Sequence, residues 1–382
     1  MQAAKDTKRP RRTGIIAAIL RIPAVQTILA SLMCVLAGLL IGYIVLLFIN
    51  PQGAGESIIN VIKNFFTWKR PQQQLKQFGN TLAKTIPLIM CSLSILFSYK
   101  VGLFNIGTAG QYVAGACASL YAALAWGWSW LPCMLFALVA GALLGAIVGA
   151  LKVYCNVNEV ISGIMLNWIA LYTTNTILTE VKEKASPYTM YFKDVNNKGA
   201  LLPNLGLDKL FNNNSYVTIA VPLCLIIAIA ITIILSKTRF GYELKATGNN
   251  KNAAKYAGMA ENRNIILTLM ISGALAGLGA SMLYQTGYMR WECTMSSVPA
   301  MGFNGIAAAF LGGLNPIGAI FSSFFIQHIT DGGQYVNTNF YSSQISDVIS
   351  SIIIYLCGFV LFIKLTMNRA IARSKEKKEA KK

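Results

Sequence analysis

The polar segment RFGYELKATGNNKNAAKYAGMAENR (239–263) separates two apolar stretches, YVTIAVPLCLIIAIAITIILS (216–236) and RNIILTLMISGALAGLGASMLYQ (263–285). Each apolar stretch has 21 residues or more, and a helix needs about 20 to cross the hydrocarbon core of a bilayer. Similar stretches recur along the 382 residues, of which 55% are hydrophobic and 12% charged. That charged share is about half of what a soluble domain carries. We therefore predict an all-α polytopic membrane protein.

The segment between these two stretches is short, mixed in charge and bounded by glycine. Its middle, NKNAAKYAG, predicts a helix that Asn249 or Asn250 caps and Gly258 ends. The two alanines, Ala253 and Ala254, would leave a flat face on which another protein could sit closely. Two interpretations are open: an ordinary solvated loop, or a surface that a soluble partner binds.

About ten spans are predicted, near residues 24–49, 79–99, 105–126, 129–152, 159–179, 216–236, 263–285, 297–311, 314–330 and 345–366. The eighth and ninth are short and separated by GGLNPIG, so they could instead be tilted half-membrane segments. Spans two to five begin outside and spans seven to ten begin inside, which would allow an inverted repeat. The transmembrane domain would cover 24–366, with outer loops at 50–78 and 180–215 and an inner loop at 238–262.

Charge sets the predicted orientation. The net charge is +19, and 22 of the 33 Lys and Arg residues fall on one side of the predicted topology. The positive-inside rule makes that side cytoplasmic, so both termini are expected inside and the protein in the cell membrane. The basic segment 1–23 and the basic tail 367–382 are expected to be solvated and close to anionic lipid, and no binding of nucleic acid is expected.

Two polar side chains interrupt the third span. Asn105 and Gln111 lie among glycines in FNIGTAGQ (104–111). Polar groups in a membrane cost free energy unless they are hydrogen-bonded, so these pair with each other, with broken backbone or with a ligand. A structural helix break and a contact with a transported solute are both open.

A second group combines an amide with aromatic rings. Asn167 lies near the middle of the fifth span and should face the interior, while Trp168 and Tyr172 share a helix face. Phe303 and Asn304 follow in the eighth segment. Amide hydrogen bonds with ring stacking suit a planar, sugar-bearing solute, and a packed aromatic core is the alternative. These residues are the candidate substrate pathway, together with Asn105 and Gln111.

Motifs for chemistry are missing. There is no phosphate-binding GxxxxGK[ST] loop, no nucleophile or metalloprotease signature and a single His, and the eight Cys show no CxxC spacing. We therefore expect no enzymatic activity, no metal site and no cofactor in this chain. Uphill transport would need energy from a partner, whereas a facilitator would need none.

Four stretches together resemble a known family: FNIGTAGQ (104–111), VISGIMLNWIALY (160–172), GYELKATGNNKNAAKYAGM (241–259) and GFNGIAAAFLGGLNPIG (302–318). They resemble permease subunits of ABC importers in the branched-chain amino acid/ribose/nucleoside group, with the nucleoside (simple sugar) branch closest. The resemblance covers about two-thirds of the chain.

This resemblance implies the type II importer permease fold, with about ten transmembrane helices. It implies two cytoplasmic ATPase subunits that use ATP and Mg²⁺, a second permease that is identical or a sister, and an extracytoplasmic substrate-binding protein, possibly a lipoprotein. By motif match, the ATPase would dock on a coupling helix with Gly248, Asn252, Ala253, Ala254, Tyr256 and Gly258.

The predicted function is therefore ATP-driven import of nucleosides. A permease for ribose, another sugar or branched-chain amino acids is the main alternative, and a facilitator that works without partners is another.

Overall fold

The computed structural model describes residues 23–369 apart from positions 338, 343, 361 and 367, so most of the two predicted basic ends lies outside the described residues. This part is mostly helical and contains no strand; it has two isolated bridges, Lys182–Thr189 and Tyr188–Glu292. The α-helices are α2 (Pro23–Ile49), α3 (Ala54–Lys63), α4 (Pro71–Tyr99), α5 (Thr108–Leu124), α6 (Trp130–Tyr154), α7 (Glu159–Leu178), α8 (Leu207–Leu210), α9 (Ala220–Lys237), α10 (Arg239–Asn249), α11 (Lys251–Tyr256), α12 (Glu261–Tyr284), α13 (Met301–Leu311), α14 (Pro316–Gly332) and α15 (Ile345–Cys357). The short 3₁₀ turns are η1 (Asn64–Thr67), η2 (Thr179–Val181), η3 (Lys198–Ala200) and η4 (Gly333–Tyr335). The predicted all-α class is confirmed.

Each predicted span contains a helix, but the helices differ in reach. Within the described residues, five are long and apolar enough to cross a membrane: α2 from Leu29, α4, α6, α9 and α12. Helix α13 has 11 residues and is about 16 Å long, roughly half the thickness of the hydrocarbon core. Helix α14 has 17 residues, or about 26 Å. The total of ten spans therefore stays a prediction.

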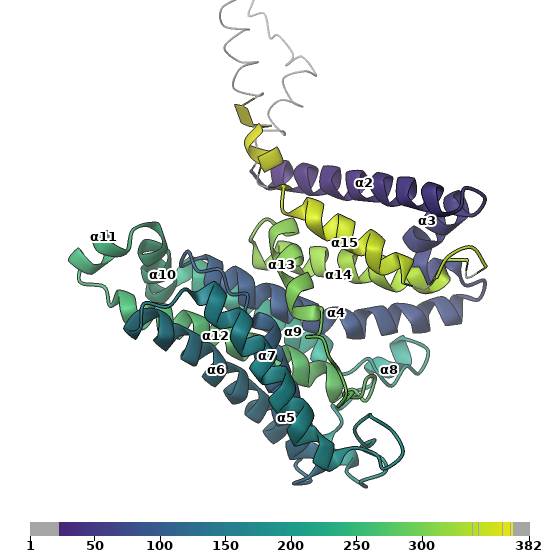
Figure 1. Cartoon of the computed structure of the whole chain (residues 1–382), viewed down its shortest axis with the longest axis horizontal. Helices are drawn as coiled ribbons and strands as arrows, with labels where there is room; N and C mark the ends of the chain where they lie inside the picture. Colours follow the sequence, from purple (N-terminus) through teal and green to yellow (C-terminus); the bar gives the residue numbers. More distant parts are fainter. Residues whose placement is uncertain (1–22, 338, 343, 361, 367, 370–382) are drawn as a thin grey trace, which may run out of the picture.

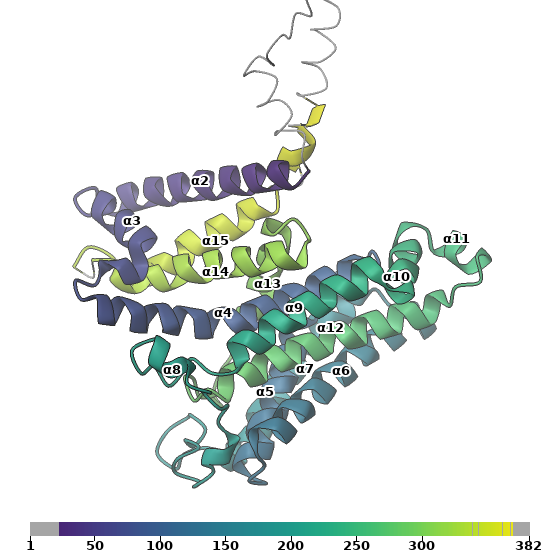
Figure 2. The ribbon, with the colours of Figure 1, turned by 180° about the vertical axis from the view of Figure 1, so that it is seen from behind.

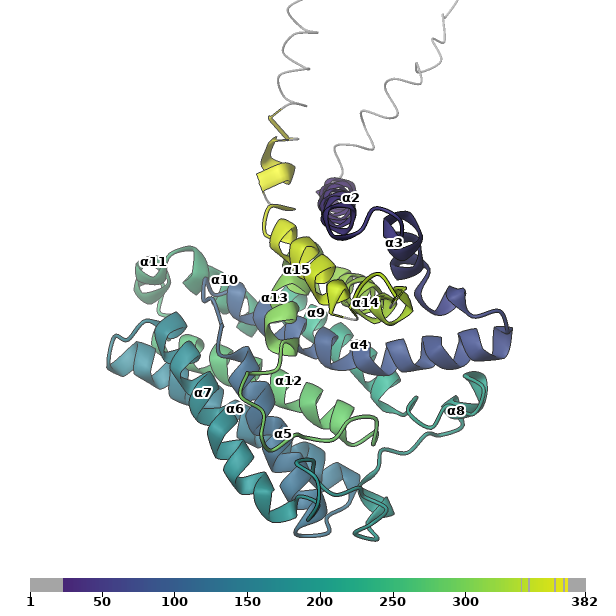
Figure 3. The same cartoon turned by 45° about the vertical axis from the view of Figure 1, so that its right-hand side comes forward.

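Helix α4 is the central element. Of its apolar window, 89% is buried, against 28% for α2 and for α9. It contacts α12 on one side and α13 and α14 on the other. Figures 1 and 3 show two groups of helices around α4: one side has α5, α6, α7 and α12, and the other side has α2, α14 and α15. Figure 2, seen from the opposite side, shows α9 alongside α4. Because α4 lies between these two groups of helices and contacts both, most of its surface is covered by protein.

Helices α6 and α12 touch through their backbones. A Cβ added to Gly273 would lie 2.1 Å from the carbonyl oxygen of Gly141, and one added to Gly145 would lie 2.1 Å from that of Leu269. Small residues at such spacing let membrane helices approach closely. This close packing is important because helices within lipid gain no hydrophobic driving force when they associate. The Gly-rich sequences of these helices are thus explained by a close-packed interface.

The first predicted outer loop, 50–78, is largely helical. It contains α3 and η1, and α4 begins at Pro71, eight residues before the predicted start at 79. Proline favours the first turn of a helix, where its missing N–H has no partner to lose. Because of this longer helix, Lys84 lies at the middle of α4, whereas the predicted span 79–99 would place it near the start.

The second predicted outer loop, 180–215, packs against the segment after α12. Arg290 pairs with Glu183 and lies 3.9 Å from the ring centroid of Tyr191. Trp291 is fully buried, and its Nε1 donates to Asn175 Oδ1 of α7 at 2.9 Å. The two segments thus form one ordered cap at the end of α7 and α12.

Candidate functional site

A buried polar cluster lies at the break between α4 and α5, where residues 100–107 are not helical. Asn105, which is 2% exposed, donates from Nδ2 to Gln111 Oε1 at 2.9 Å and to Ser272 Oγ at 2.7 Å. Gln111 is fully buried and donates back to Asn105 Oδ1 at 3.4 Å. Ser272 Oγ donates to the backbone oxygen of Ser94 at 2.8 Å. The cluster therefore ties α4, α5 and α12 together.

Asn167 joins α7 to the same break. It is 2% exposed, as its predicted interior position requires. Its Oδ1 accepts from the backbone N–H of Gly110 at 2.7 Å, and its Nδ2 donates to the backbone oxygen of Ile106 at 3.1 Å. The Asn167 side chain thus pairs with the Gly110 N–H and the Ile106 carbonyl, two backbone groups that lack a helical partner at the break between α4 and α5. These bonds support the helix-break interpretation, and contact with a solute stays a prediction.

The predicted aromatic pair lies on the outer face of α7. Trp168 and Tyr172 are stacked, with ring centroids 6.1 Å apart, and are 41% and 56% exposed. The packed-core alternative does not apply to them. Phe303 is 41% exposed, and Asn304 is half-buried. Helix α13 meets α5 near these two residues, because a Cβ added to Gly302 would lie 2.5 Å from Ala109 Cα.

Helix α10 is folded tightly against the bundle. Thr238 caps it, accepting from Gly241 N–H at 3.1 Å, and Leu244 is fully buried. Gly248 rests on the segment that follows α4: a Cβ there would lie 2.6 Å from the carbonyl oxygen of Lys100 and 2.8 Å from the Val101 backbone. Gly248 is therefore a packing position within the chain.

Two further observations define the α10 contact. Thr247 Oγ1 accepts from Asn264 Nδ2 of α12 at 3.2 Å. Burial, followed by the charge of Lys245 on α10, lowers the pKa of the Lys100 ammonium. Helix α10 thus touches both the end of α4 and the start of α12.

Helix α11 matches the helix predicted within 249–258. Asn250 Oδ1 accepts from Ala253 N–H at 3.0 Å, and Gly258 follows the helix at φ +78°. Figure 1 shows α11 projecting from one end of the bundle, opposite the end where α3 lies. This confirms the predicted cap and the predicted glycine stop.

The exposure of the α11 side chains corrects one expectation. Tyr256 is 93% exposed, and Asn252 and Ala253 are also exposed, but Ala254 is 3% exposed. Consecutive residues of a helix point in directions about 100° apart, so the two alanines cannot form a single flat face. Ala253 belongs to the open surface and Ala254 to the packed side.

The sequence pattern missed Ser94 and Ser272 as members of the polar cluster. A signal existed, because Asn264, Thr268 and Ser272 recur every four residues and so form one polar stripe on α12. Thr268 and Asn264 are fully buried. In an apolar helix, such a stripe marks the side that faces polar partners within the protein.

The described residues contain no group of three or more His, Cys, Asp or Glu that could hold a metal ion, and the seven cysteines from Cys34 to Cys293 are free. The polar groups brought together here are amides and hydroxyls. They can orient helices and donate or accept hydrogen bonds.

Comparison with known proteins identifies the family of this chain. A family model described as "Branched-chain amino acid transport system / permease component" matches residues 77–358. The chain belongs to this permease family. The matched range runs from α4 to the end of α15 and includes the α4–α5 break, α10 and α11.

Relatives extend the similarity to nearly the whole chain. The nucleoside ABC transporter permease protein NupB of Lactococcus lactis is 31% identical over 93% of this chain and 97% of its own length. The guanosine ABC transporter permease protein NupP of Bacillus subtilis is 30% identical over 90% and 96%. The glucose ABC transporter permease protein TsgB13 of Haloferax volcanii is 27% identical over 87% and 84%. No solved structure matches.

Proposed function

We propose that this chain is the membrane permease subunit of an ATP-driven ABC importer for nucleosides. The observation that carries the proposal is similarity over nearly the whole length of two relatives, named nucleoside and guanosine permeases, at 31% and 30% identity. The glucose permease at 27% and a D-allose permease of Escherichia coli at 26% are more distant. Sugars are therefore the second candidate class of substrate, and branched-chain amino acids the third.

The proposed topology has ten spans with both termini in the cytoplasm. Its support is the coincidence of each predicted span with a helix, together with the basic residues of α10 and α11 at one end of the bundle. Helices α13 and α14 supply the eighth and ninth of these spans. An inverted repeat would pair the break at 104–111 with the break at 302–318.

The proposed partners rest on the relatives, which are named as ABC transporter permeases, and on one exposed helix. A cytoplasmic ATPase, which uses ATP and Mg²⁺, docks on α11, where Asn252, Ala253 and Tyr256 are exposed. A second permease subunit, which is either identical to this chain or a sister of it, completes the pathway. An extracytoplasmic substrate-binding protein, proposed to be a lipoprotein, delivers the solute. This chain contributes no catalytic group and no cofactor of its own.

The proposed pathway side chains fall into two roles. Trp168 and Tyr172 of α7, with Phe303 and Asn304 of α13, contribute to the surface that meets the solute and the second permease. The buried amides of Asn105, Gln111 and Asn167 hold the α4–α5 break in shape. Stacking and an amide suit the flat base and polar sugar of a nucleoside.

The proposed coupling route begins at α11. A force on α11 reaches α10, whose Gly248 lies against the backbone that follows α4. Because Thr247 bonds to Asn264, the same movement also reaches α12, which carries Ser272 of the polar cluster. Net uptake needs ATP because a solute alone cannot bias the two-state equilibrium against its own gradient.

Reconstituted vesicles test the proposal. The chain is incorporated with its ATPase, second permease and binding protein, and uptake of labelled guanosine and uridine is compared with that of ribose and leucine. ATP-dependent nucleoside uptake is expected. Uptake of ribose or leucine instead would change the substrate class, and uptake without ATP or ATPase would refute the importer in favour of a facilitator.

A further inference from the structure

A rigid turn precedes α4 at the end of the bundle opposite α11. Gln74 Nε2 donates to the backbone oxygen of Trp68 at 2.7 Å, and Trp68 Nε1 donates to the hydroxyl of Tyr335 at 3.0 Å. Phe65, at the start of the turn, is 7% exposed and packs against the rings of Phe78 and His328. The turn is thus held from both sides by contacts within the chain.

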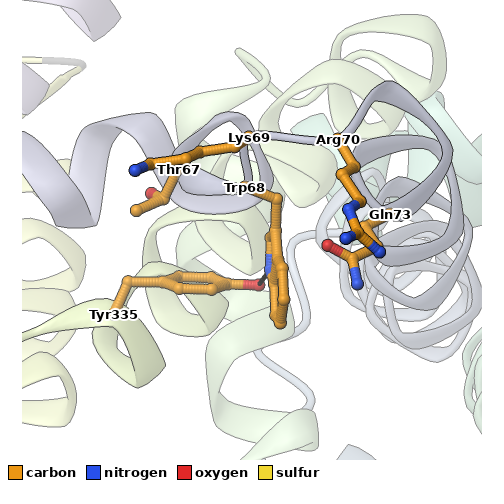
Figure 4. Close-up of a pocket in the computed structure, with 6 residues that line it drawn as sticks. All are labelled: Thr67, Trp68, Lys69, Arg70, Gln73 and Tyr335. Atoms are coloured by element: carbon orange, nitrogen blue, oxygen red, sulfur yellow. Dashed lines mark hydrogen bonds between the residues drawn. The ribbon is translucent and has the colours of Figure 1, made fainter.

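This turn frames an open hollow of about 390 Å³, lined by Thr67, Trp68, Lys69, Arg70, Gln73 and Tyr335. Figure 4 shows the Trp68 indole in the middle, with Lys69 and Arg70 reaching to either side of it and Gln73 beside Arg70. Both cations are exposed. The hollow therefore offers an ammonium, a guanidinium and an amide around an aromatic ring, a set that suits an anionic, phosphate-like group.

The charge around the hollow is one-sided. Between residues 50 and 83 the sequence has four cations, Lys63, Lys69, Arg70 and Lys76, and one acid, Glu56. All four cations are exposed. The nearby carboxylate of Asp331 is 2.8 Å from Lys84 and so is already paired. No side chain that lines the hollow can neutralise Lys69 or Arg70.

The neighbouring surface is apolar. Helix α3 buries Ala54, Ser57 and Val61 and leaves large apolar side chains of the α3–η1 segment in the open: Ile59 is 49% exposed, Ile62 46% and Phe66 62%. A helix with one apolar face open to its surroundings is typical of a segment lying in the membrane interface. Trp and Tyr also prefer this level. The apolar face and the cationic hollow are joined through η1.

We propose that this hollow binds the phosphate headgroup of an anionic phospholipid. Arg70 contacts the phosphodiester, Gln73 beside it donates to an unesterified oxygen, and Lys69 on the other side of Trp68 adds positive charge near the headgroup. The acyl chains lie along Ile62 and Phe66. A lipid is favoured over a soluble anion because apolar side chains adjoin the cations. The site is separate from the coupling and pathway surfaces and anchors α3 and the start of α4 to the membrane.

Native mass spectrometry of the full chain released from detergent micelles tests this inference without any transport assay. Phosphatidylglycerol and phosphatidylcholine are titrated separately, and the dissociation constant of the first bound lipid is compared. We expect Lys69→Gln/Arg70→Gln to weaken the first phosphatidylglycerol by at least about fivefold and to leave phosphatidylcholine unchanged. Lys193→Gln/Lys198→Gln, which removes two exposed cations from the second outer loop, is the matched control.

Each other outcome refutes the proposal. Equal losses in both variants would mean non-specific attraction to total charge. Competition by inorganic phosphate at the same concentration would assign the hollow to a free anion. Unchanged lipid binding, with weaker binding of the substrate-binding protein to the Lys69→Gln/Arg70→Gln variant in a pull-down, would assign the cations to that protein. None of these results depends on which solute is transported.

Discussion

Replacing Lys84 by Met removes one half of an ion pair from the interior of α4. Lys84 Nζ lies 2.8 Å from Asp331 Oδ1 of α14, and the two side chains are 15% and 10% exposed. Gln327 Nε2 also donates to Asp331 Oδ1 at 3.1 Å. Met has an unbranched side chain about as long as the aliphatic part of Lys, so the change removes the charged ammonium and keeps most of the packing volume. Asp331 would then be a buried carboxylate with one neutral donor.

The expected cost follows from this geometry. Breaking a buried pair by removing one partner costs about 3–5 kcal/mol, because the remaining charge is uncompensated. Since Gln327 still donates to Asp331, we expect the lower end, about 3 kcal/mol. For a chain of this length, that corresponds to a fall in Tm of about 3–6 °C. The double variant Lys84→Met/Asp331→Asn has no buried charge and should lose less than Lys84→Met alone.

Thermal unfolding of the purified protein in detergent measures these differences. Arg239→Gln is the control, since Arg239 pairs with Glu243 at 3.0 Å but its side chain is 93% exposed. Such a surface pair is worth about 0.5 kcal/mol or less, so the control should shift Tm by less than about 1 °C. A Tm for Lys84→Met within that range, or a double variant as unstable as the sum of its singles, would refute the reasoning.

Three further substitutions separate coupling from folding. Gly248→Val would place a Cβ 2.6 Å from the carbonyl oxygen of Lys100. ATP-dependent uptake in vesicles should then fall roughly tenfold, while membrane insertion stays normal. Unchanged uptake would contradict the proposed coupling through α10. Ala253→Trp lies on the exposed side of α11 and should abolish co-purification of the ATPase at unchanged Tm, whereas a lower Tm with the ATPase still bound would assign the residue to the core. Gly273→Val would meet the carbonyl oxygen of Gly141, with its Cβ 2.1 Å away, so we expect a loss of about 3 kcal/mol or more and a poor folded yield in size-exclusion chromatography. Gly55→Ala, whose added Cβ meets nothing within 4 Å, is its control and should behave as wild type.

Local signals predicted the elements well. The cap at Asn250 and the stop at Gly258 act within a few residues, so the sequence pattern was enough to place α11. The interior position of Asn167 followed from one amide in an apolar run, because a lone amide in lipid is costly. The start of α4 was missed because the sequence between 71 and 78 is polar, and hydropathy alone cannot tell a helix that extends past the membrane from a loop.

The tertiary partners could not be predicted in this way. Ser272 lies 167 residues from Asn105 along the chain, and their hydrogen bond depends on how α12 packs against α4 and α5. The same holds for Ala254, which is buried only because of the side on which α11 packs. Adjacent alanines are equivalent in the sequence, and tertiary contacts make them different.

Helix α4 connects the features that matter for movement. The backbone that follows its last turn meets Gly248 of α10, and Ser94 near its C-terminal end bonds to Ser272 of α12. Its middle is joined to α14 by Lys84 and Asp331. A displacement that begins at α11 therefore acts on a helix whose middle is held by an ion pair in a low-dielectric interior, where neither charge has another charged partner nearby among the described residues. Either α4 moves together with α14, which keeps the pair intact, or the pair separates at a large cost. Because the first course is far cheaper, we expect α4 and α14 to move as one body when α10 is pushed.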